Sequence, residues 1–125
     1  MTKFIDTNVI IKAFTDNEDK ERCRKAMLQE FITNSLCLVE AQHTISLIKN
    51  NKIYASTCIK SLFKSNAIII DLNRNLLFES FKRLIKYDLN IFDLINYVTA
   101  LIYNCSEFVS YDKHFDNLEI KRVEP

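Results

Sequence analysis

The 125-residue sequence predicts an α/β fold, a three-layer α/β/α sandwich in which a four- to five-stranded parallel sheet lies between two layers of helices. Short apolar segments alternate with helical segments along the chain, a pattern typical of parallel sheets with helical crossovers. Some of the short segments are uninterrupted apolar runs, as expected for strands that helices cover on both faces. Right-handed crossovers place the carboxyl ends of all strands at one edge, where open α/β sheets hold their sites.

The first expected elements alternate as this fold requires. Residues 2–5 form a short apolar strand that ends at Asp6, and residues 7–14 continue as a short helix. The run at 15–18 (TDNE) is a helix start signal, so a second helix is expected from there to about residue 33. Three residues spaced four apart form its buried side: Cys23, Met27 and Phe31.

The next segment is expected to contain a strand followed by two helices. Residues 35–39 (SLCLV) are a continuous apolar run that ends at Glu40, which is typical of a buried strand. Residues 40–50 and 53–65 show helical patterns. This order predicts that Glu40 lies at the carboxyl end of the strand.

Residues 67–72 (AIIIDL) form the clearest buried strand, because they are rich in β-branched residues. Residues 74–88 are expected to be helical, with Glu79 and Arg83 as a favourable pair four residues apart. The apolar stripe of this helix consists of Leu77, Phe81 and Leu84.

The last elements complete the sheet. Asn90 can cap a helix over 91–103, whose buried stripe is Ile91, Ile95, Val98 and Ile102. Residues 107–111 form a strand that ends at Asp112, and residues 119–123 are the optional fifth strand.

Charge is unevenly distributed, although the net charge is only +1. Residues 41–87 contain 8 basic and 2 acidic residues, whereas residues 88–125 contain 3 basic and 7 acidic residues. Solvated helix faces could produce this pattern by chance. Alternatively, a basic surface lies beside an acidic site, as an enzyme acting on phosphodiesters requires.

The sequence contains no glycine, and its one proline is the last residue. Walker-type phosphate loops and GxGxxG fingerprints are therefore excluded, because both need glycine where the backbone approaches phosphate. Helices usually end on a left-handed glycine, and asparagine best replaces it. The asparagines expected at helix ends are Asn34, Asn50 or Asn51, Asn66, Asn90 and Asn104.

The four cysteines lie in apolar contexts without CxxC spacing, which favours buried free thiols over a zinc site or disulfides. The longest charge-free stretch, residues 94–106, is too short to span a membrane. The first residues lack the apolar run of a signal peptide. These features predict a soluble cytoplasmic protein.

Four carboxylates occupy comparable places in the expected fold: Asp6, Glu40, Asp93 and Asp112. Three of them follow expected strands, and Asp93 lies in the first turn of the helix that begins after Asn90. Each has a structural alternative, such as helix capping, a favourable helix dipole or an Asx-turn. If the four gather at one edge, however, their ionised forms repel each other and need a compensating charge.

A divalent cation is the natural compensator, because no Lys or Arg lies within two residues of Asp6, Glu40 or Asp93. Ligation by oxygen alone favours Mg²⁺ or Mn²⁺. Such a site suits phosphodiester hydrolysis, in which one ion lowers the pKa of a bound water and a second, about 4 Å away, stabilises the leaving oxygen. A purely structural ion is the alternative for the same ligands.

Four segments resemble the successive motifs of PIN-domain nucleases, with the greatest likeness to the VapC-type toxins of toxin–antitoxin systems. They are FIDTN at 4–8, LVEAQ at 38–42, FDLINYVTAL at 92–101 and SYDKHF at 110–115. The resemblance extends over nearly the whole chain, in order and with fitting spacing. It implies a single PIN-like domain over residues 1–125.

The resemblance also assigns roles. Asp6, Glu40, Asp93 and Asp112 match the metal-binding acidic quartet, in which Glu40 shares a metal or orients the attacking water. Supporting residues are matched by Asn8, Ser110 and Asp116. The resemblance also implies an activity, the Mg²⁺- or Mn²⁺-dependent cleavage of RNA. It further implies a homodimer and a small antitoxin protein that inhibits the cleavage. The usual glycines near the family's turns are absent here.

Other polar residues have simpler explanations. His114 and His43 are expected to be a partly exposed turn residue and a helix-face residue. A set of lysines either provides solubility or guides the RNA backbone: Lys49, Lys52, Lys60 and Lys64.

Two other functions fit the same fold. A catalytically silent PIN-like module would bind RNA or a protein partner without metal-dependent turnover. A phospho-receiver would need adjacent acids after the first strand and a lysine at a late strand end. Here Asp6 stands alone, and Lys113 lies beyond the carboxylate of Asp112.

Overall fold

The computed structural model describes residues 2–125 and contains a sheet of five strands that are all parallel, in the order β3-β2-β1-β4-β5. The strands are β1 (Lys3–Ile5), β2 (Phe31–Asn34), β3 (Ala67–Ile70), β4 (Glu107–Val109) and β5 (Lys121–Val123). The predicted fold class is confirmed, including the optional fifth strand.

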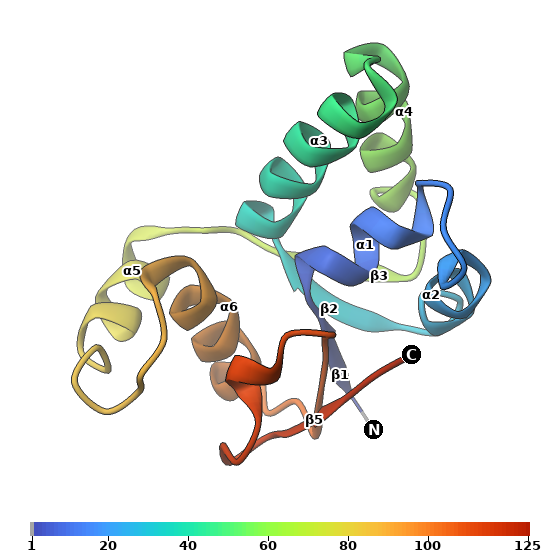
Figure 1. Cartoon of the computed structure of the whole chain (residues 1–125). Helices are drawn as coiled ribbons and strands as arrows, with labels where there is room; N and C mark the ends of the chain where they lie inside the picture. The colour runs from blue at the N-terminus through green and yellow to red at the C-terminus, as the bar shows by residue number, and fades with distance from the viewer. Residues whose placement is uncertain (1) are drawn as a thin grey trace.

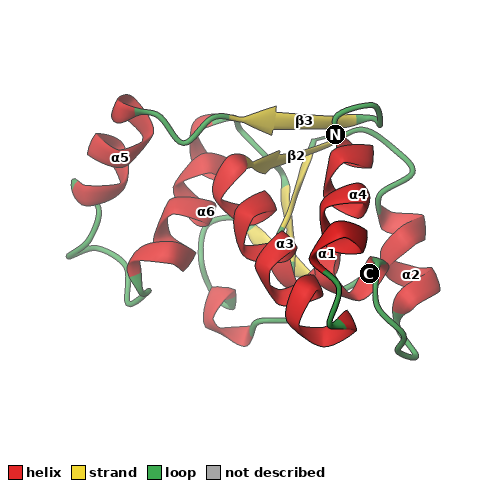
Figure 2. Ribbon diagram, turned by 90° about the horizontal axis from the view of Figure 1, so that it is seen from above, coloured by secondary structure: helices red, strands yellow, loops and turns green. Residues whose placement is uncertain are grey.

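Helices cover the sheet on both sides. They are α1 (Thr7–Ala13), α2 (Lys20–Ala26), α3 (Ser35–Lys49), α4 (Lys52–Leu62), α5 (Arg74–Phe81) and α6 (Ile91–Ile102), with a 3₁₀ turn, η1, at Lys113–Phe115. Figure 1 shows α5 and α6 on one side of the strands and α1 and α2 on the other, and Figure 2 shows the same division from above. Helix α3 contacts both α1 and α6, so its amino-terminal end lies above the sheet edge between them.

The core is centred on β1, which pairs with β2 and β4. Phe4 and Phe108 are directly opposite in register, and their rings stack at 5.0 Å. Tyr97 from α6 and Phe115 from η1 pack on the Phe108 ring, at centroid distances of 5.8 and 4.3 Å. These contacts fix α6 and η1 against the strand that ends beside the site.

One strand lies four residues earlier than predicted. Residues 31–34 (FITN) form β2, whereas residues 35–39 begin α3, so the predicted strand at 35–39 and the helix to residue 33 are wrong. The Asn34 side chain accepts a hydrogen bond from the Cys37 backbone N–H and caps α3. A short apolar run at a buried helix start has the same composition as a buried strand, and periodicity cannot separate the two.

Two other segments differ from prediction in burial. Strand β3 lies at the edge of the sheet, and Ile68 is exposed, so β3 is not a buried strand.

Helix α5 ends at Phe81 rather than at residue 88. Its predicted stripe is wrong at two of its three positions, because Phe81 and Leu84 are exposed, whereas Leu77 is half-buried against the core. Leu76 and Ser80 are the buried residues of this helix. The Glu79–Arg83 ion pair is present at 2.9 Å.

Helix α6 agrees more closely with prediction, since Asn90 caps it and Ile95 and Val98 are buried. The predicted buried stripe extends too far at both ends of the helix, because Ile91 is only half-buried and Ile102 is exposed.

Asparagine replaces glycine where a left-handed backbone is needed. The positive-φ residues among those described are Asn50 (48°), Asn104 (55°) and Asn117 (64°). The first two follow α3 and α6 as expected. The assignments of Asn34 and Asn90 to helix ends are wrong, since these residues begin α3 and α6, and Asn66 does not adopt a positive φ.

All four cysteines are buried, as predicted. Within residues 2–125, every helix is too short or too polar to cross a membrane.

Candidate active site

Asp6 is the buried anchor of the acidic edge. It follows β1 and caps α1, with its side chain 4% exposed. Its Oδ1 accepts hydrogen bonds from the Thr7 backbone N–H (2.9 Å) and Asn96 Nδ2 (3.2 Å). Its Oδ2 accepts from Ser110 Oγ (2.8 Å) and Asn8 Nδ2 (3.3 Å). A carboxylate has about four acceptor positions, so all of them are occupied.

Ser110 connects the two aspartates that follow neighbouring strands. Its fully buried hydroxyl donates to Asp6 and accepts from Asn8 Nδ2 and from the Asp112 backbone N–H, both at 3.0 Å. Asn8 Oδ1 in turn accepts from the Tyr111 backbone N–H at 3.2 Å. The two residues predicted to support the aspartates therefore tie the ends of β1 and β4 together.

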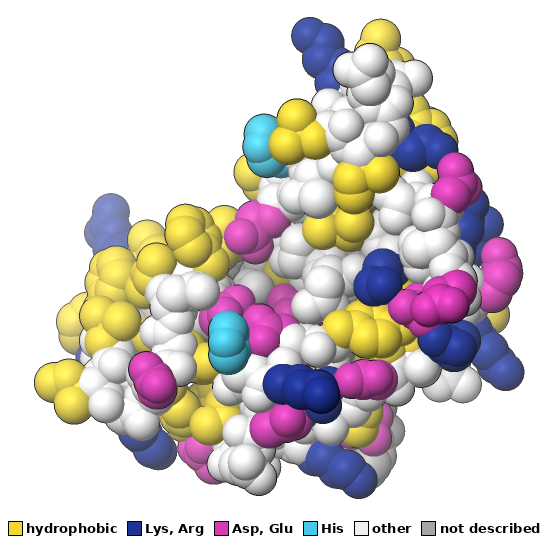
Figure 3. Space-filling model, in the orientation of Figure 1, with side chains coloured by type: hydrophobic (Ala, Val, Ile, Leu, Met, Phe, Trp, Pro, Cys, Tyr) yellow, Lys and Arg dark blue, Asp and Glu magenta, His cyan; other side chains and the backbone are white. Residues whose placement is uncertain are grey.

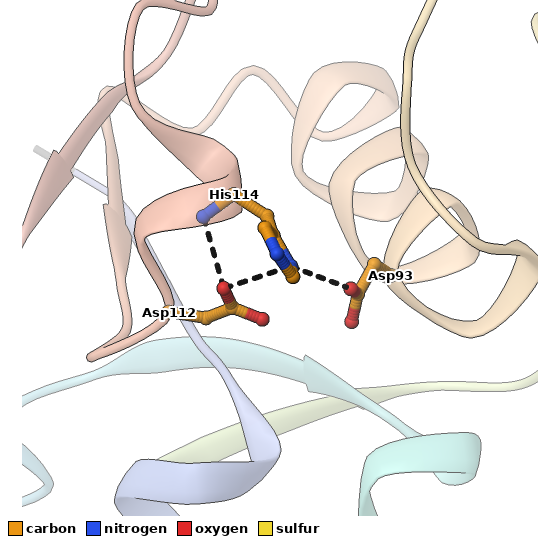
Figure 4. A group of neighbouring side chains, drawn as sticks. All are labelled: Asp93, Asp112 and His114. Atoms are coloured by element: carbon orange, nitrogen blue, oxygen red, sulfur yellow. Dashed lines mark hydrogen bonds and ion pairs between the residues drawn. The ribbon is translucent and has the colours of Figure 1, made fainter.

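Asp93, Asp112 and His114 form the more exposed part of the site, in which the two aspartates are half-buried (Figure 4). Asp93 lies in the first turn of α6 and Asp112 caps η1. His114 Nδ1 lies 3.1 Å from Asp112 Oδ1 and 3.9 Å from Asp93 Oδ2. His114 is an exposed residue of η1, consistent with the expected turn role, but its ring also lies between the two carboxylates.

Glu40 reaches the same edge from α3 and not from a strand end, which corrects its predicted placement. It is half-buried, and its Oε1 accepts a hydrogen bond from Thr7 Oγ1 at 3.2 Å. Figure 3 shows Asp and Glu side chains beside a histidine in a hollow between the α3–α4 arm and the α5–α6 side of the molecule.

The site is short of positive charge. Burial raises the pKa of Asp6 to about 6, against hydrogen bonds from Ser110 and Thr7, and the charges of Asp93 and Asp112 raise it further. Burial also raises the pKa of Glu40 and of Asp93; a neighbouring carboxylate adds to each rise, from Asp93 and Asp112 respectively. At neutral pH these carboxylates ionise at a cost that a bound cation would remove.

The residues present fit a divalent cation. One ligand atom each from Asp93, Asp112 and His114 lies within 4.8 Å of the others. Ligands on opposite sides of Mg²⁺ lie about 4 Å apart, so a small adjustment suffices. Asp6 would join only by releasing a hydrogen bond, of which the 3.3 Å bond from Asn8 is the longest.

Asp116 does not join the acidic cluster but pairs with Arg122. Its Oδ1 lies 2.6 Å from Arg122 Nε, and Arg122 Nη1 donates to the Ser110 carbonyl at 2.9 Å. Arg122 thus ties β5 to both ends of the loop that carries Asp112.

The predicted RNA-contacting lysines do not form one group. Lys49 is paired with Asp16 at 3.0 Å. Lys52 begins α4 and is exposed. Lys60 and Lys64 are exposed and line a shallow depression of about 360 Å³ at the end of α4.

Asn96 and Thr7 contact the acids, and the sequence patterns do not predict either of them as a site residue. The available signal for Asn96 is a polar residue in the middle of a buried apolar helix, three residues after Asp93. The signal for Thr7 is its place directly after Asp6.

A doubly wound parallel sheet with carboxylates gathered at its carboxyl edge, and no glycine loop, defines an α/β protein with an acidic site. The family model described as the PIN domain matches residues 3–121. The chain therefore belongs to the PIN-domain family, as its motifs predict.

Solved structures with the same fold include toxins of toxin–antitoxin pairs. Mycobacterium tuberculosis VapC20, described as a toxin that cleaves the sarcin–ricin loop, matches with a TM-score of 0.82 and 12% identity over 98% of this chain and 99% of that one. A toxin–antitoxin complex from Klebsiella pneumoniae matches with a TM-score of 0.76 and 16% identity over 97% and 95% of the two chains. VapBC2 from Rickettsia felis, bound to a promoter DNA fragment, matches with a TM-score of 0.74 and 17% identity over 100% of this chain and 99% of that one.

These identities are low, so the structural matches define the fold. No curated protein shows a significant sequence match to the chain.

Proposed function

We propose that the protein is a Mg²⁺- or Mn²⁺-dependent endoribonuclease that hydrolyses RNA phosphodiester bonds as a single PIN-like domain in the cytoplasm. The observation that carries this proposal is the gathering of Asp6, Glu40, Asp93 and Asp112 at one sheet edge, with burial and mutual repulsion raising the pKa of three of them. Such a site needs a cation, and a cation there suits phosphate chemistry.

The acids have different tasks in this proposal. Asp93 and Asp112 hold the metal at the exposed side, and Asp6 supplies an oxygen from the buried side. Glu40 is half-buried and its pKa is raised, so its carboxylate can accept a proton from an attacking water. The hydrogen bond from Thr7 Oγ1 holds this carboxylate in place. The bound ion supplies a more acidic water and stabilises charge on the leaving oxygen.

We further propose that the protein is the toxin of a toxin–antitoxin pair and that a small antitoxin protein binds it. The support is membership in the PIN-domain family, together with the toxin–antitoxin complexes that share the fold. An antitoxin that covers the hollow in Figure 3 would exclude RNA from the acids.

A homodimer is proposed on the apolar surface at α5 and the turns after it. Phe78, Phe81, Leu84 and Ile85 are exposed there, and the Ile85 side chain is fully exposed. Contiguous apolar surface of this kind marks interaction sites. Ile85→Asp should convert the dimer to a monomer in light scattering; a wild type that is already a monomer would contradict this part.

The activity is tested with purified protein, RNA and Mn²⁺. Cleavage should require Mn²⁺ or Mg²⁺, stop on chelation and be abolished by Asp6→Asn. The matched control is Asp71→Asn, because Asp71 also follows a strand at the same edge but is exposed. Cleavage that survives Asp6→Asn would indicate a contaminating nuclease, whereas metal binding without cleavage would favour the silent RNA- or protein-binding module.

A further inference from the structure

A buried group of side-chain amides lies directly behind the acidic edge. Asn96 on α6 is 2% exposed and Asn34 at the end of β2 is fully buried. Both lie among apolar core residues, where an amide without hydrogen-bond partners would cost considerable stability. Their partners therefore indicate what the amides do.

Asn96 binds Asp6 from the interior. Its Nδ2 donates to Asp6 Oδ1 at 3.2 Å, and the Thr7 backbone N–H donates to the same oxygen. These two donors fix Oδ1. The other oxygen, Oδ2, accepts from Ser110 Oγ at 2.8 Å and from Asn8 Nδ2 at 3.3 Å, and the longer bond from Asn8 is the one whose release would free a position for a metal.

Asn34 fixes the orientation of Asn96. Its Nδ2 donates to Asn96 Oδ1 and to Thr99 Oγ1, both at 3.0 Å. Because Asn96 Oδ1 accepts from Asn34, the Asn96 amide cannot flip without placing two donors against each other. The Asn96 NH₂ group is thereby held toward Asp6.

The same amides connect the elements that carry the other acids. Asn96 lies one turn after Asp93 on α6. Asn34 Oδ1 accepts from the Cys37 backbone N–H and caps α3, the helix that carries Glu40. The buried amides thus link β1, α3 and α6 at the points where each presents an acid.

We propose that Asn96, oriented by Asn34, is a positioning residue that directs the Asp6 carboxylate toward the divalent metal held by Asp93 and Asp112. This inference rests on the proposed metal-dependent function. Groups that orient metal ligands typically change metal affinity by about 10- to 100-fold when removed.

The test compares Asn96→Ala with Val98→Ala. Val98 lies on the same helix and is fully buried, but it packs in the apolar core, so its truncation controls for lost stability. Mn²⁺ affinity is measured by titration calorimetry, and kcat and KM are measured with RNA. Asn96→Ser, which replaces the amide with a hydroxyl that can still donate a hydrogen bond and leaves room for a water, is the conservative variant.

Asn96→Ala should weaken Mn²⁺ binding about tenfold or more. It should lower kcat at fixed Mn²⁺ while KM for RNA stays unchanged; Val98→Ala should bind Mn²⁺ like the wild type, and Asn96→Ser should be intermediate. Equal Mn²⁺ affinity in the wild type and Asn96→Ala would overturn the inference while leaving the proposed function intact. If Asn96→Ala does not fold, Asn96→Ser decides by the same criterion, and a wild type that binds no Mn²⁺ overturns both proposals.

Discussion

The acidic edge has two halves that differ in how their side chains are held. In the buried half, Asp6 accepts four hydrogen bonds, and its neighbours Ser110 and Asn96 are tied to other elements in turn. In the exposed half, Asp93 and Asp112 lie on either side of His114, and each accepts one further hydrogen bond, from Asn90 Nδ2 at 3.2 Å and from the His114 backbone N–H at 2.9 Å. The buried half is fixed by the fold, whereas the carboxylates of the exposed half keep acceptor positions for a ligand.

Because of this difference, the two halves should contribute differently to the stability and to the activity of the protein. Loss of a group in the buried half should disturb both the fold and the activity, because its hydrogen bonds are also part of the core. Loss of a group in the exposed half should affect the activity alone.

Asp112→Asn should lower RNA cleavage roughly a thousandfold, because a neutral amide stabilises bound metal and charge in the transition state poorly. Stability without metal should stay within about 0.5 kcal/mol of the wild type, since asparagine caps a turn as well as aspartate does. Single-turnover cleavage and denaturant unfolding with chelator measure the two effects. A large loss of stability would show that the exposed half also holds the fold.

The buried half should reveal itself in the pH dependence of stability. The pKa of Asp6 in the folded protein, about 6, lies above its ordinary value of 3.8, so protonated Asp6 favours the folded state. Stability from this group is complete only below its ordinary value of 3.8 and is lost as the pH rises through 6. Without metal, the wild type should therefore lose about 2 kcal/mol relative to Asp6→Asn between pH 4 and pH 7.

Denaturant unfolding of both proteins across this pH range, with chelator, gives the difference directly. A difference that stays flat, or that grows in favour of the wild type with rising pH, would contradict the buried position of Asp6. Added Mn²⁺ should restore much of the wild-type loss at pH 7, because the ion binds the ionised form.

Ser110→Ala should cost about 2 kcal/mol of stability, because it removes a donor to Asp6 and leaves the donors of Asn8 and Asp112 without their acceptor. Cleavage should also fall by about 10- to 100-fold. Ser80→Ala is the matched control: Ser80 is equally buried, but its hydroxyl donates only to the Leu76 carbonyl. Equal cleavage by the two variants would contradict a role of Ser110 in the site.

The smallest effect is expected outside both halves. Replacing Lys60 and Lys64 together with alanine should reduce cleavage a few-fold and flatten its dependence on log salt by about 1.4, the value for two contacts to single-stranded nucleic acid. The control is the double replacement of Lys25 and Lys121, which are also exposed. An unchanged salt dependence would exclude the α4 lysines from RNA binding.

The sequence indicates the acids of both halves, and Asn8 and Ser110 through the family resemblance, but it does not indicate the hydrogen bonds that connect them. Patterns at element boundaries indicate Asp6, Asp93 and Asp112. The sequence also indicates Glu40 as an acid of the site, but it predicts this residue at a strand end. The apolar run before it belongs to α3, whose start depends on the cap that Asn34 provides within the folded protein.

The buried half depends on contacts between distant residues, which local patterns do not contain. Asn96 and Asp6 are 90 positions apart, and Ser110 and Asp6 are 104 apart. The same reason explains α5, where the predicted stripe assumed a helix continuing to residue 88. Phe81 and Leu84 are exposed because α5 ends at Phe81 and the turns after it carry them away from the core.

The most direct test of the central claim is the position of Mn²⁺ in crystals soaked with that ion, located by its anomalous scattering. The peak should lie between the carboxylates of Asp93 and Asp112, within coordination distance of both, and it should disappear in Asp112→Asn crystals. Absence of a peak at this edge in fully soaked crystals, or a peak that persists unchanged in Asp112→Asn, would contradict the claim that these carboxylates form a metal site.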